Sequence, residues 1–398
     1  MVKCAAGIPG QGQDRARRAR DRTRAGGSLA HAGAGGADGG GGGVNKYMDA
    51  KHSGFCMQIH DILRQDPEVW RLFSCAEEYE IAFRDGYDRF PHYVSSNREP
   101  FRPRASQYLV EQGYHPEYPD GQPFAVCLTH DIDGVYRSVL SKGYATLSSL
   151  KNGDLARALA NARQVRSKKV PLCNFKEIMA LEEEYGARSS FYFLALAPGD
   201  QDYSYDIGEL EGEMGMIADA GWEVGLHGGH RAYCDPEALA AEKQRLEAVL
   251  GRPVIGYRNH FLRFRVPETW EHLSRTGLRY DATFGYADCV GFRNGMCHPF
   301  KPYDIRSGRE IDILEIPLTI MDCTLDLYMR LDPGKAWDIT RRLIDEAESC
   351  HGVITILWHN TYMEGERLKL YERILRYCRE KGAWMTSGRE ICSQRQNV

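Results

Sequence analysis

Three short polar clusters each follow an apolar run of strand length, and their residue types suit metal-assisted hydrolysis. The first cluster comes after residues 124–128 and reads Thr129-His130-Asp131-Ile132-Asp133-Gly134. Two carboxylates separated by one residue can divide the work, because one can bind a divalent metal while the other takes a proton from water. Asp131 and Asp133 are therefore candidate catalytic and metal-binding groups, with a pair of turn aspartates as the alternative interpretation.

The second cluster supplies imidazole groups and glycines. It follows an expected strand at 222–226 and reads Gly225-Leu226-His227-Gly228-Gly229-His230-Arg231. Neutral imidazole is a common metal donor, and glycines let the backbone approach a ligand closely. A His-Gly-Gly stretch also forms the oxyanion hole of some serine esterases, but the sequence has no Gly-x-Ser-x-Gly nucleophile elbow. The pattern therefore favours a metal site.

The third cluster and a further stretch supply a histidine and an arginine. Leu357-Trp358-His359-Asn360 ends an apolar run, and His359 could give a proton to a departing amine. The further stretch follows an expected strand at 254–257 and reads Gly256-Tyr257-Arg258-Asn259-His260. Arg258 could pair with a catalytic carboxylate and fix its orientation and pKa, while a surface ion pair is the competing interpretation.

The elements that must position these clusters alternate along the chain. The apolar runs predict strands at 124–128, 189–196, 222–226, 254–257, 311–317 and 353–358. Helical patterns lie between or after them at 207–220, 236–250, 267–276, 334–349 and 364–381, and an earlier helix is expected at 77–86. This alternation predicts an α/β architecture with a mainly parallel sheet, in which ligands bind where the strands end.

Taken in order, the clusters resemble the polysaccharide deacetylase superfamily, the NodB-homology domain of carbohydrate esterase type, over residues 124–381. The stretch from Tyr280-Asp281-Ala282-Thr283 to Cys297-His298-Pro299-Phe300 is similar to a subgroup found with bacterial surface-polysaccharide genes. The resemblance implies an irregular (β/α) barrel, usually of seven strands. It also implies roles for residues that match the family motifs: Asp131 as base, Asp133 and His227 as metal ligands, Arg258 as the residue that holds the base, and His359 as general acid.

The sequence departs from the family pattern in ways that leave the third metal ligand open. Ile132 separates two aspartates that are usually adjacent, and Arg231 stands where the family places a second histidine, four residues after His227. His230 and His260 are the remaining candidates. His230 shares a loop with His227, whereas His260 follows a different strand whose loop should open onto the same mouth of the barrel.

The resemblance implies a metal-dependent N-deacetylase that acts on an N-acetylated amino sugar or a polysaccharide. The expected cofactor is a divalent metal, with Zn²⁺ as the first choice, and the expected partner is a carbohydrate substrate. Two other functions stay open. The chain could hydrolyse another C–N amide bond, as in a formamide or a ureide, or it could be a non-catalytic sugar-binding member of the family.

Composition and charge indicate the compartment, the partners and the domain organisation of the chain. A formal net charge of -4 and 12 scattered cysteines predict a cytoplasmic protein with reduced thiols and no nucleic-acid partner, and no apolar run is long enough for a transmembrane segment. We expect a disordered low-complexity tail at 1–46, an extension at 47–123 that packs on the barrel, and the barrel itself at 124–398. The barrel should carry a helical insertion at 137–175, whose basic face at 137–169 is either solvated or in contact with an anionic glycan or membrane surface.

Overall fold

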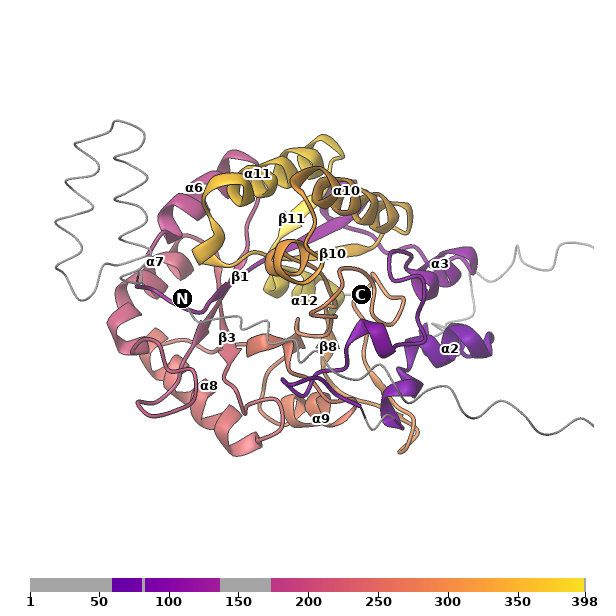
Figure 1. The fold of residues 1–398 in the computed structure, drawn as a ribbon, viewed down its shortest axis with the longest axis horizontal. Coiled ribbons are helices and arrows are strands. Elements are labelled where there is room, and N and C mark those ends of the chain that lie inside the picture. The colour runs from indigo at the N-terminus through magenta and orange to yellow at the C-terminus, as the bar shows by residue number, and fades with distance from the viewer. Residues whose placement is uncertain (1–58, 81–82, 137–172, 397–398) are drawn as a thin grey trace, which may run out of the picture. The chain divides into compact units, whose positions relative to one another are not determined.

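The structure, a computed structural model, describes residues 59–80, 83–136 and 173–396. Its centre is a curled sheet in which every paired strand is parallel to its neighbour (Figure 1). In spatial order the strands are β8 (Leu314–Glu315), β5 (Tyr280–Asp281), β4 (Gly256–Asn259), β3 (Glu223–Gly228), β2 (Ser190–Leu194), β1 (Ala125–Ile132), β10 (Val353–Leu357) and β9 (Leu318–Met321), with β11 (Trp384–Thr386) also paired to β1.

This sheet confirms the expected irregular (β/α) barrel, with differences of detail. Among the described residues it has nine strands rather than seven, and three of these, the two-residue strands β5 and β8 and the three-residue β11, are very short. Among the described residues, no strand pairing joins β8 to β9, so the barrel is open there. β1 continues through the first polar cluster to Ile132, since pairing with β2 extends from Thr129 to that residue.

Helices surround the sheet (Figure 1), and they include the five expected between 207 and 381 as well as α6 and α12, which were not predicted. They are α6 (Phe175–Glu184), α7 (Glu211–Asp219), α8 (Pro236–Leu250), α9 (Glu268–Ser274), α10 (Pro333–Ser349), α11 (Gly365–Glu380) and α12 (Gly388–Gln396). Helix α8 has the bounds expected because Asp235 caps its first amides, Pro236 opens its first turn and Gly251 ends it at a φ of 71°.

The two ends of the barrel differ in the elements and side chains that they carry. The first amides of α12 donate hydrogen bonds to Ser190 Oγ and Glu223 Oε2, which lie at the starts of β2 and β3. Helix α12 therefore lies at the amino-terminal end of these strands, away from the polar clusters. The opposite end, where the strands finish, carries the chemistry.

The segment before the barrel contacts the chain between β5 and β6 (Tyr303–Asp304). The segment before the barrel contains α1 (Ile59–Leu63), α2 (Pro67–Phe73), the 3-10 turn η2 (Ala76–Tyr79) and α3 (Arg104–Glu111). The helix expected at 77–86 is wrong, because within its described residues only this short turn is helical. Tertiary contacts override helix propensity here: Glu77 binds Ser95 Oγ at 2.6 Å and Glu78 binds Arg293.

The ion pair between Glu78 and Arg293 gives a stability prediction. The two side chains are 3% and 2% exposed and meet at 2.6 and 2.9 Å, so Glu78→Gln leaves a buried guanidinium without its counter-charge. We expect the free energy of unfolding to fall by about 3 kcal/mol or more, measured by urea denaturation. Glu80→Gln, at the exposed end of the same turn, is the matched control and should change it little. Equal unfolding midpoints for the two variants would show that the buried pair contributes nothing net.

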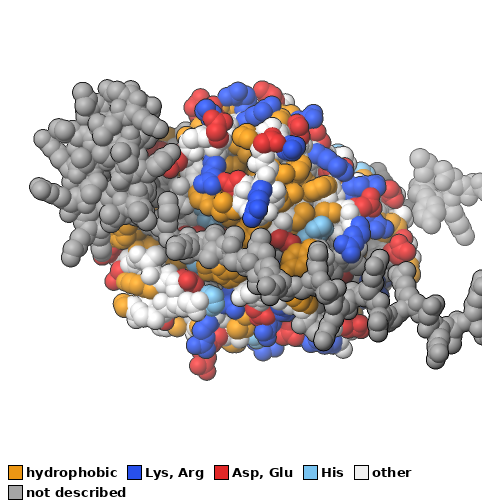
Figure 2. All heavy atoms as spheres, in the orientation of Figure 1, with side chains coloured by type: hydrophobic (Ala, Val, Ile, Leu, Met, Phe, Trp, Pro, Cys, Tyr) orange, Lys and Arg blue, Asp and Glu red, His pale blue; other side chains and the backbone are white. Residues whose placement is uncertain are grey.

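Several expectations lie outside the described residues. These are the tail at 1–46 and nearly all of the insertion at 137–175, including its basic face at 137–169. None of the helices in the described part of the chain has the length and apolar character that a bilayer crossing requires. Figure 2 shows Lys, Arg, Asp and Glu side chains intermixed over the visible face, in keeping with the formal net charge of -4.

Candidate metal and catalytic site

The polar clusters meet at the carboxyl ends of the strands. Asp131 lies in β1 and Asp133 just beyond it, His227 lies in β3, His260 directly follows β4, and His359 lies two residues after the end of β10. The parallel registers pair Leu194 of β2 with His227, and His227 with Arg258 of β4. Because parallel strands finish at the same edge, residues more than 200 positions apart in sequence come together there.

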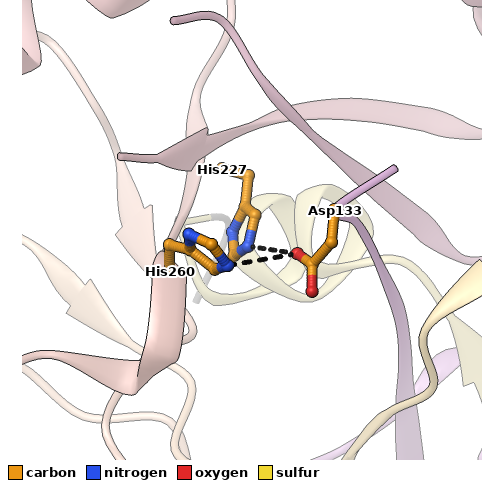
Figure 3. A group of neighbouring side chains, drawn as sticks. All are labelled: Asp133, His227 and His260. Atoms are coloured by element: carbon orange, nitrogen blue, oxygen red, sulfur yellow. Dashed lines mark hydrogen bonds and ion pairs between the residues drawn. The ribbon is translucent and has the colours of Figure 1, made fainter. Parts of the chain in front are cut away.

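The centre of the site is the carboxylate of Asp133 facing two imidazoles (Figure 3). His227 Nε2 lies 3.2 Å from Asp133 Oδ1, and His260 Nε2 lies 3.7 Å from the same oxygen. One donor atom from each residue lies within 4.8 Å of the others. Both histidines are nearly inaccessible, whereas 24% of the Asp133 side chain is exposed, so the group opens to solvent on the carboxylate side.

The protonation chemistry of these groups fits a divalent cation. The pKa of Asp133 is lowered overall, because His260, His227 and His359 outweigh the opposing effect of burial. Burial, with help from the charge of His227, lowers the pKa of His260 to about 4, so its imidazole is neutral. Burial lowers the pKa of His227, but Asp131 and Asp133 more than offset this and raise it, so a bound cation would displace a proton there.

The ring orientation of His227 also fits metal binding. Its Nδ1 donates a hydrogen bond to the carbonyl oxygen of Arg258 at 3.0 Å, which leaves Nε2 directed at Asp133. A hydrogen bond of this kind from the second ring nitrogen is the usual support of a metal-binding histidine. Two histidines and one carboxylate, with one open side, form a donor set typical of catalytic zinc.

Of the two histidines left open by the sequence, the structure brings His260 to Asp133. His230 instead lies with Asp202, at 3.0 Å between Nδ1 and Oδ2, and with the amide of Gln201. The glycines before it explain its direction. A Cβ on Gly228 would come within 2.2 Å of the Tyr257 hydroxyl, so the backbone at the end of β3 packs closely against Tyr257. His230, two residues later, lies beyond the group around Asp133.

Arg258 does not make the contact expected of it. Its guanidinium is fully buried and donates to Thr129 Oγ1 at 2.9 Å, and it forms no ion pair with Asp131 among the described side chains. Among the described side chains, Arg258 therefore makes neither the direct pairing with Asp131 nor a surface ion pair. Strands β3 and β2 separate β4 from β1, so Arg258 reaches across the barrel interior and meets β1 two residues before Asp131, on the same face.

Asp131 itself is buried beside the metal group. Its side chain is 4% exposed, its Oδ2 lies 3.7 Å from His227 Nε2, and its Oδ1 has no hydrogen-bond partner. It is not one of the three clustered donors. Such a carboxylate has a lone pair free to accept a proton next to the site where a cation would bind.

His359 lies on the other side of Asp133, with Nε2 3.6 Å from Oδ2. Its Nδ1 and backbone amide bind the two carboxylate oxygens of Asp322 at 2.7 and 2.6 Å. Burial lowers the pKa of His359, but Asp322, followed by Asp133, raises it to about 10. The imidazole is therefore protonated at neutral pH and can act as a proton donor.

Asp322 belongs to the candidate site through its contacts with His359, and the sequence analysis missed it. It directly follows β9, so it carries the same signal as the other clusters, but the strand expected at 311–317 ends before it. Asp322, Cys323 and His359 also lie close enough together to hold a metal. However, the Asp322 oxygens already accept three N–H groups, from Cys323 N and twice from His359, so this group serves to anchor His359.

His130, in the first cluster, lies on the outer face of the sheet and connects β1 to the end of β10. Its ring nitrogens bind the carbonyl oxygen of Trp358 at 2.7 Å and Glu182 Oε1 at 2.8 Å, with both side chains of the ion pair fully buried. Trp358 directly precedes His359. This contact therefore ties the strand that carries Asp131 to the strand end that carries His359.

Several solved structures are similar to this chain at low sequence identity. No protein-family model matches the chain, and no curated protein sequence matches it. Among solved structures, a candidate polysaccharide deacetylase from Mycobacterium smegmatis is 17% identical, with 72% of this chain and 95% of that chain covered and a TM-score of 0.49. A CE4 family pseudoenzyme from Bacillus anthracis is 11% identical, with coverage of 70% and 68% and a TM-score of 0.38.

A family 4 carbohydrate esterase from Streptomyces lividans, solved with acetate, is 13% identical, with 67% of this chain and 92% of that chain covered and a TM-score of 0.34. The solved structures similar to this chain thus include proteins described as polysaccharide deacetylases and carbohydrate esterases. Identities and TM-scores this low do not transfer an activity, so any assignment of function depends on the site itself.

Proposed function

We propose that the chain is a metal-dependent hydrolase that removes the acetyl group from the nitrogen of an N-acetylated amino sugar or polysaccharide. The observation that carries this proposal is the arrangement around Asp133. One carboxylate oxygen faces the donor nitrogens of His227 and His260, and the other faces the protonated His359. A buried carboxylate, Asp131, lies beside the same group.

Each of these side chains has a distinct task in amide hydrolysis. Asp133, His227 and His260 would hold a divalent ion, with zinc expected, which supplies polarisation of the amide carbonyl and a lowered pKa for water. Asp131 takes the proton of the attacking water through an oxygen that has no other partner. His359 gives the proton on Nε2 to the departing amine, while Asp322 holds Nδ1. The products are a free amine and acetate.

The arrangement also favours catalysis over the non-catalytic alternative. A site that only binds sugars needs neither a buried carboxylate with a free oxygen nor an imidazole held by a buried carboxylate next to one donor group. Both are present here, and Asp322 is 1% exposed in its contact with His359. Groups with such opposed environments are typical of paired acid and base roles.

A substrate panel tests the proposal and separates its rivals. Zinc-loaded protein is incubated with N-acetylated amino sugars and their oligomers, with formamides and with ureides, and acetate, formate and ammonia are measured. Acetate from the sugars supports deacetylation. Formate or ammonia instead would identify a hydrolase of another C–N bond. Full zinc occupancy with no product from any substrate would favour the sugar-binding alternative.

Replacement of the proton donor gives a second prediction. His359→Gln should lower turnover by about 10²-fold, because general acid catalysis of this kind contributes about 10²–10⁴-fold. Zinc affinity should stay close to that of the parent, since His359 is not among the three donors around His227. His230→Gln is the matched control and should keep turnover. If His359→Gln loses zinc as well, His359 binds the metal directly.

A further inference from the structure

The backbone directly after His260 is strained. Phe261 has a φ of 60° and Leu262 a φ of 55°, so two consecutive residues other than glycine lie in the left-handed region. Each such residue costs on the order of 1 kcal/mol or more, and neither side chain has the polar atoms that let Asn and Asp adopt this conformation. The strained pair therefore needs contacts from elsewhere in the structure to hold it.

His260 also lacks the ring support that His227 has. Its Nδ1 has no hydrogen-bond partner, and the nearest carboxylate oxygen, Asp202 Oδ2, is 3.8 Å away. The flat face of its ring instead lies on the ring of Phe261, with centroids 3.9 Å apart and planes at 20°. The direction of the His260 imidazole therefore depends on the backbone and side chain of Phe261.

We propose that Arg89 and Tyr87, in the segment 84–89 that precedes the barrel in sequence, position the metal donor His260 by holding the strained residues at the start of the loop at 260–265. We call these segments the 84–89 turn and the 260–265 loop. The inference rests on the metal site of the proposed function and adds a positioning element from outside the barrel. Arg89 is the central positioning residue.

Four hydrogen bonds that involve charged side chains join the 84–89 turn to the 260–265 loop. They run from Arg89 Nη1 to Phe261 O (3.1 Å), from Arg84 Nη1 to Phe264 O (2.9 Å), from Arg263 Nε to Tyr87 O (2.8 Å) and from Arg265 Nε to Asp88 Oδ2 (2.8 Å). Only the first reaches the strained pair. In addition, the ring of Tyr87 packs on that of Phe261 at 4.7 Å, on the path that leads to His260.

Arg89 is itself fixed before it meets the loop. The residue is 7% exposed, and Asp85 Oδ2 binds both its Nε and its Nη2 at 2.7 Å. The second oxygen of Asp85 accepts the backbone amides of Tyr87 and Arg89 at 2.9 Å. This turn therefore presents a preorganised donor to the Phe261 carbonyl, at little further cost in side-chain entropy.

Zinc affinity of the full-length chain tests the inference without use of activity. Zinc binding is measured by competition with a chelator, and the absorption spectrum of bound Co²⁺ reports the geometry of the donors. Arg89→Ala should weaken zinc binding by about 10 to 100-fold, the range found when a residue that orients a metal donor is lost. The Co²⁺ spectrum should change as well. Arg84→Ala, whose contact lies three residues further along the loop, is the matched control and should keep affinity and spectrum.

A second variant protects the test against unfolding. If Arg89→Ala does not fold, Tyr87→Leu removes the ring that packs on Phe261 from a partly exposed position and should weaken zinc binding in the same direction. Parent-like affinity in the folded variant, or equal loss in Arg84→Ala, overturns the inference. Failure of the parent chain to bind zinc would overturn the metal site of the proposed function, so the two failures are distinguishable.

Discussion

Asp131→Asn should lose nearly all turnover and keep its metal. The amide preserves the size of the side chain but cannot take a proton from water, so we expect kcat/KM to fall by about 10²-fold or more. Metal affinity should persist, since Asp131 is not one of the clustered donors and lies 3.7 Å from the nearest of them, His227 Nε2. Acetate release and a zinc titration on the same protein measure the two effects separately.

A carboxylate nearby provides the control. Asp202 lies beside His230 and within 3.8 Å of His260 Nδ1, yet it has no place in the proton transfers. Asp202→Asn should therefore keep turnover within about threefold of the parent value, because a change this small means that no transition-state contact has been lost. If Asp131→Asn also stays within that range, Asp131 is not the base, and another group must accept the proton.

The strand-end rule explains why much of the site could be predicted from the sequence. Asp133, His227 and His359 were found because each follows or ends an apolar run, and parallel strands finish at a common edge. Asp322 obeys the same rule after β9. It was missed because β9 is a four-residue strand, Leu318–Met321, directly after Pro317, whereas the predicted strand ended at that proline.

Two features could not be predicted because they depend on tertiary geometry. The partner of Arg258 is set by the curvature that brings β4 opposite β1, so the side chain meets Thr129 rather than Asp131. The direction of His260 is set by left-handed backbone at Phe261 and Leu262, which no local preference of those residues predicts. Disagreement between local preference and structure is typical of functional sites.

The choice between His260 and His230 as third metal donor gives the last prediction. His260 Nε2 faces the same oxygen, Asp133 Oδ1, as His227, so His260→Ala removes a metal donor. Zinc binding should weaken by well over the roughly 100-fold that is the upper limit when a residue that only orients a donor is lost. His230→Ala removes only a partner of Asp202 and Gln201. Zinc binding should weaken by less than the roughly 10-fold that is the lower limit for loss of an orienting residue.

The two alanine variants also distinguish between arrangements of the loops around the metal. Loss of zinc in His230→Ala with parent affinity in His260→Ala would require the chain after Gly229 to turn back toward Asp133, against the close contacts that Gly228 and Gly229 make with Tyr257 and Leu196. Parent affinity in both variants would mean that only Asp133 and His227 hold the ion, one fewer than the three protein ligands usual at catalytic zinc. The structure predicts neither result, because, of these two histidines, His260 and not His230 lies at the Asp133 carboxylate.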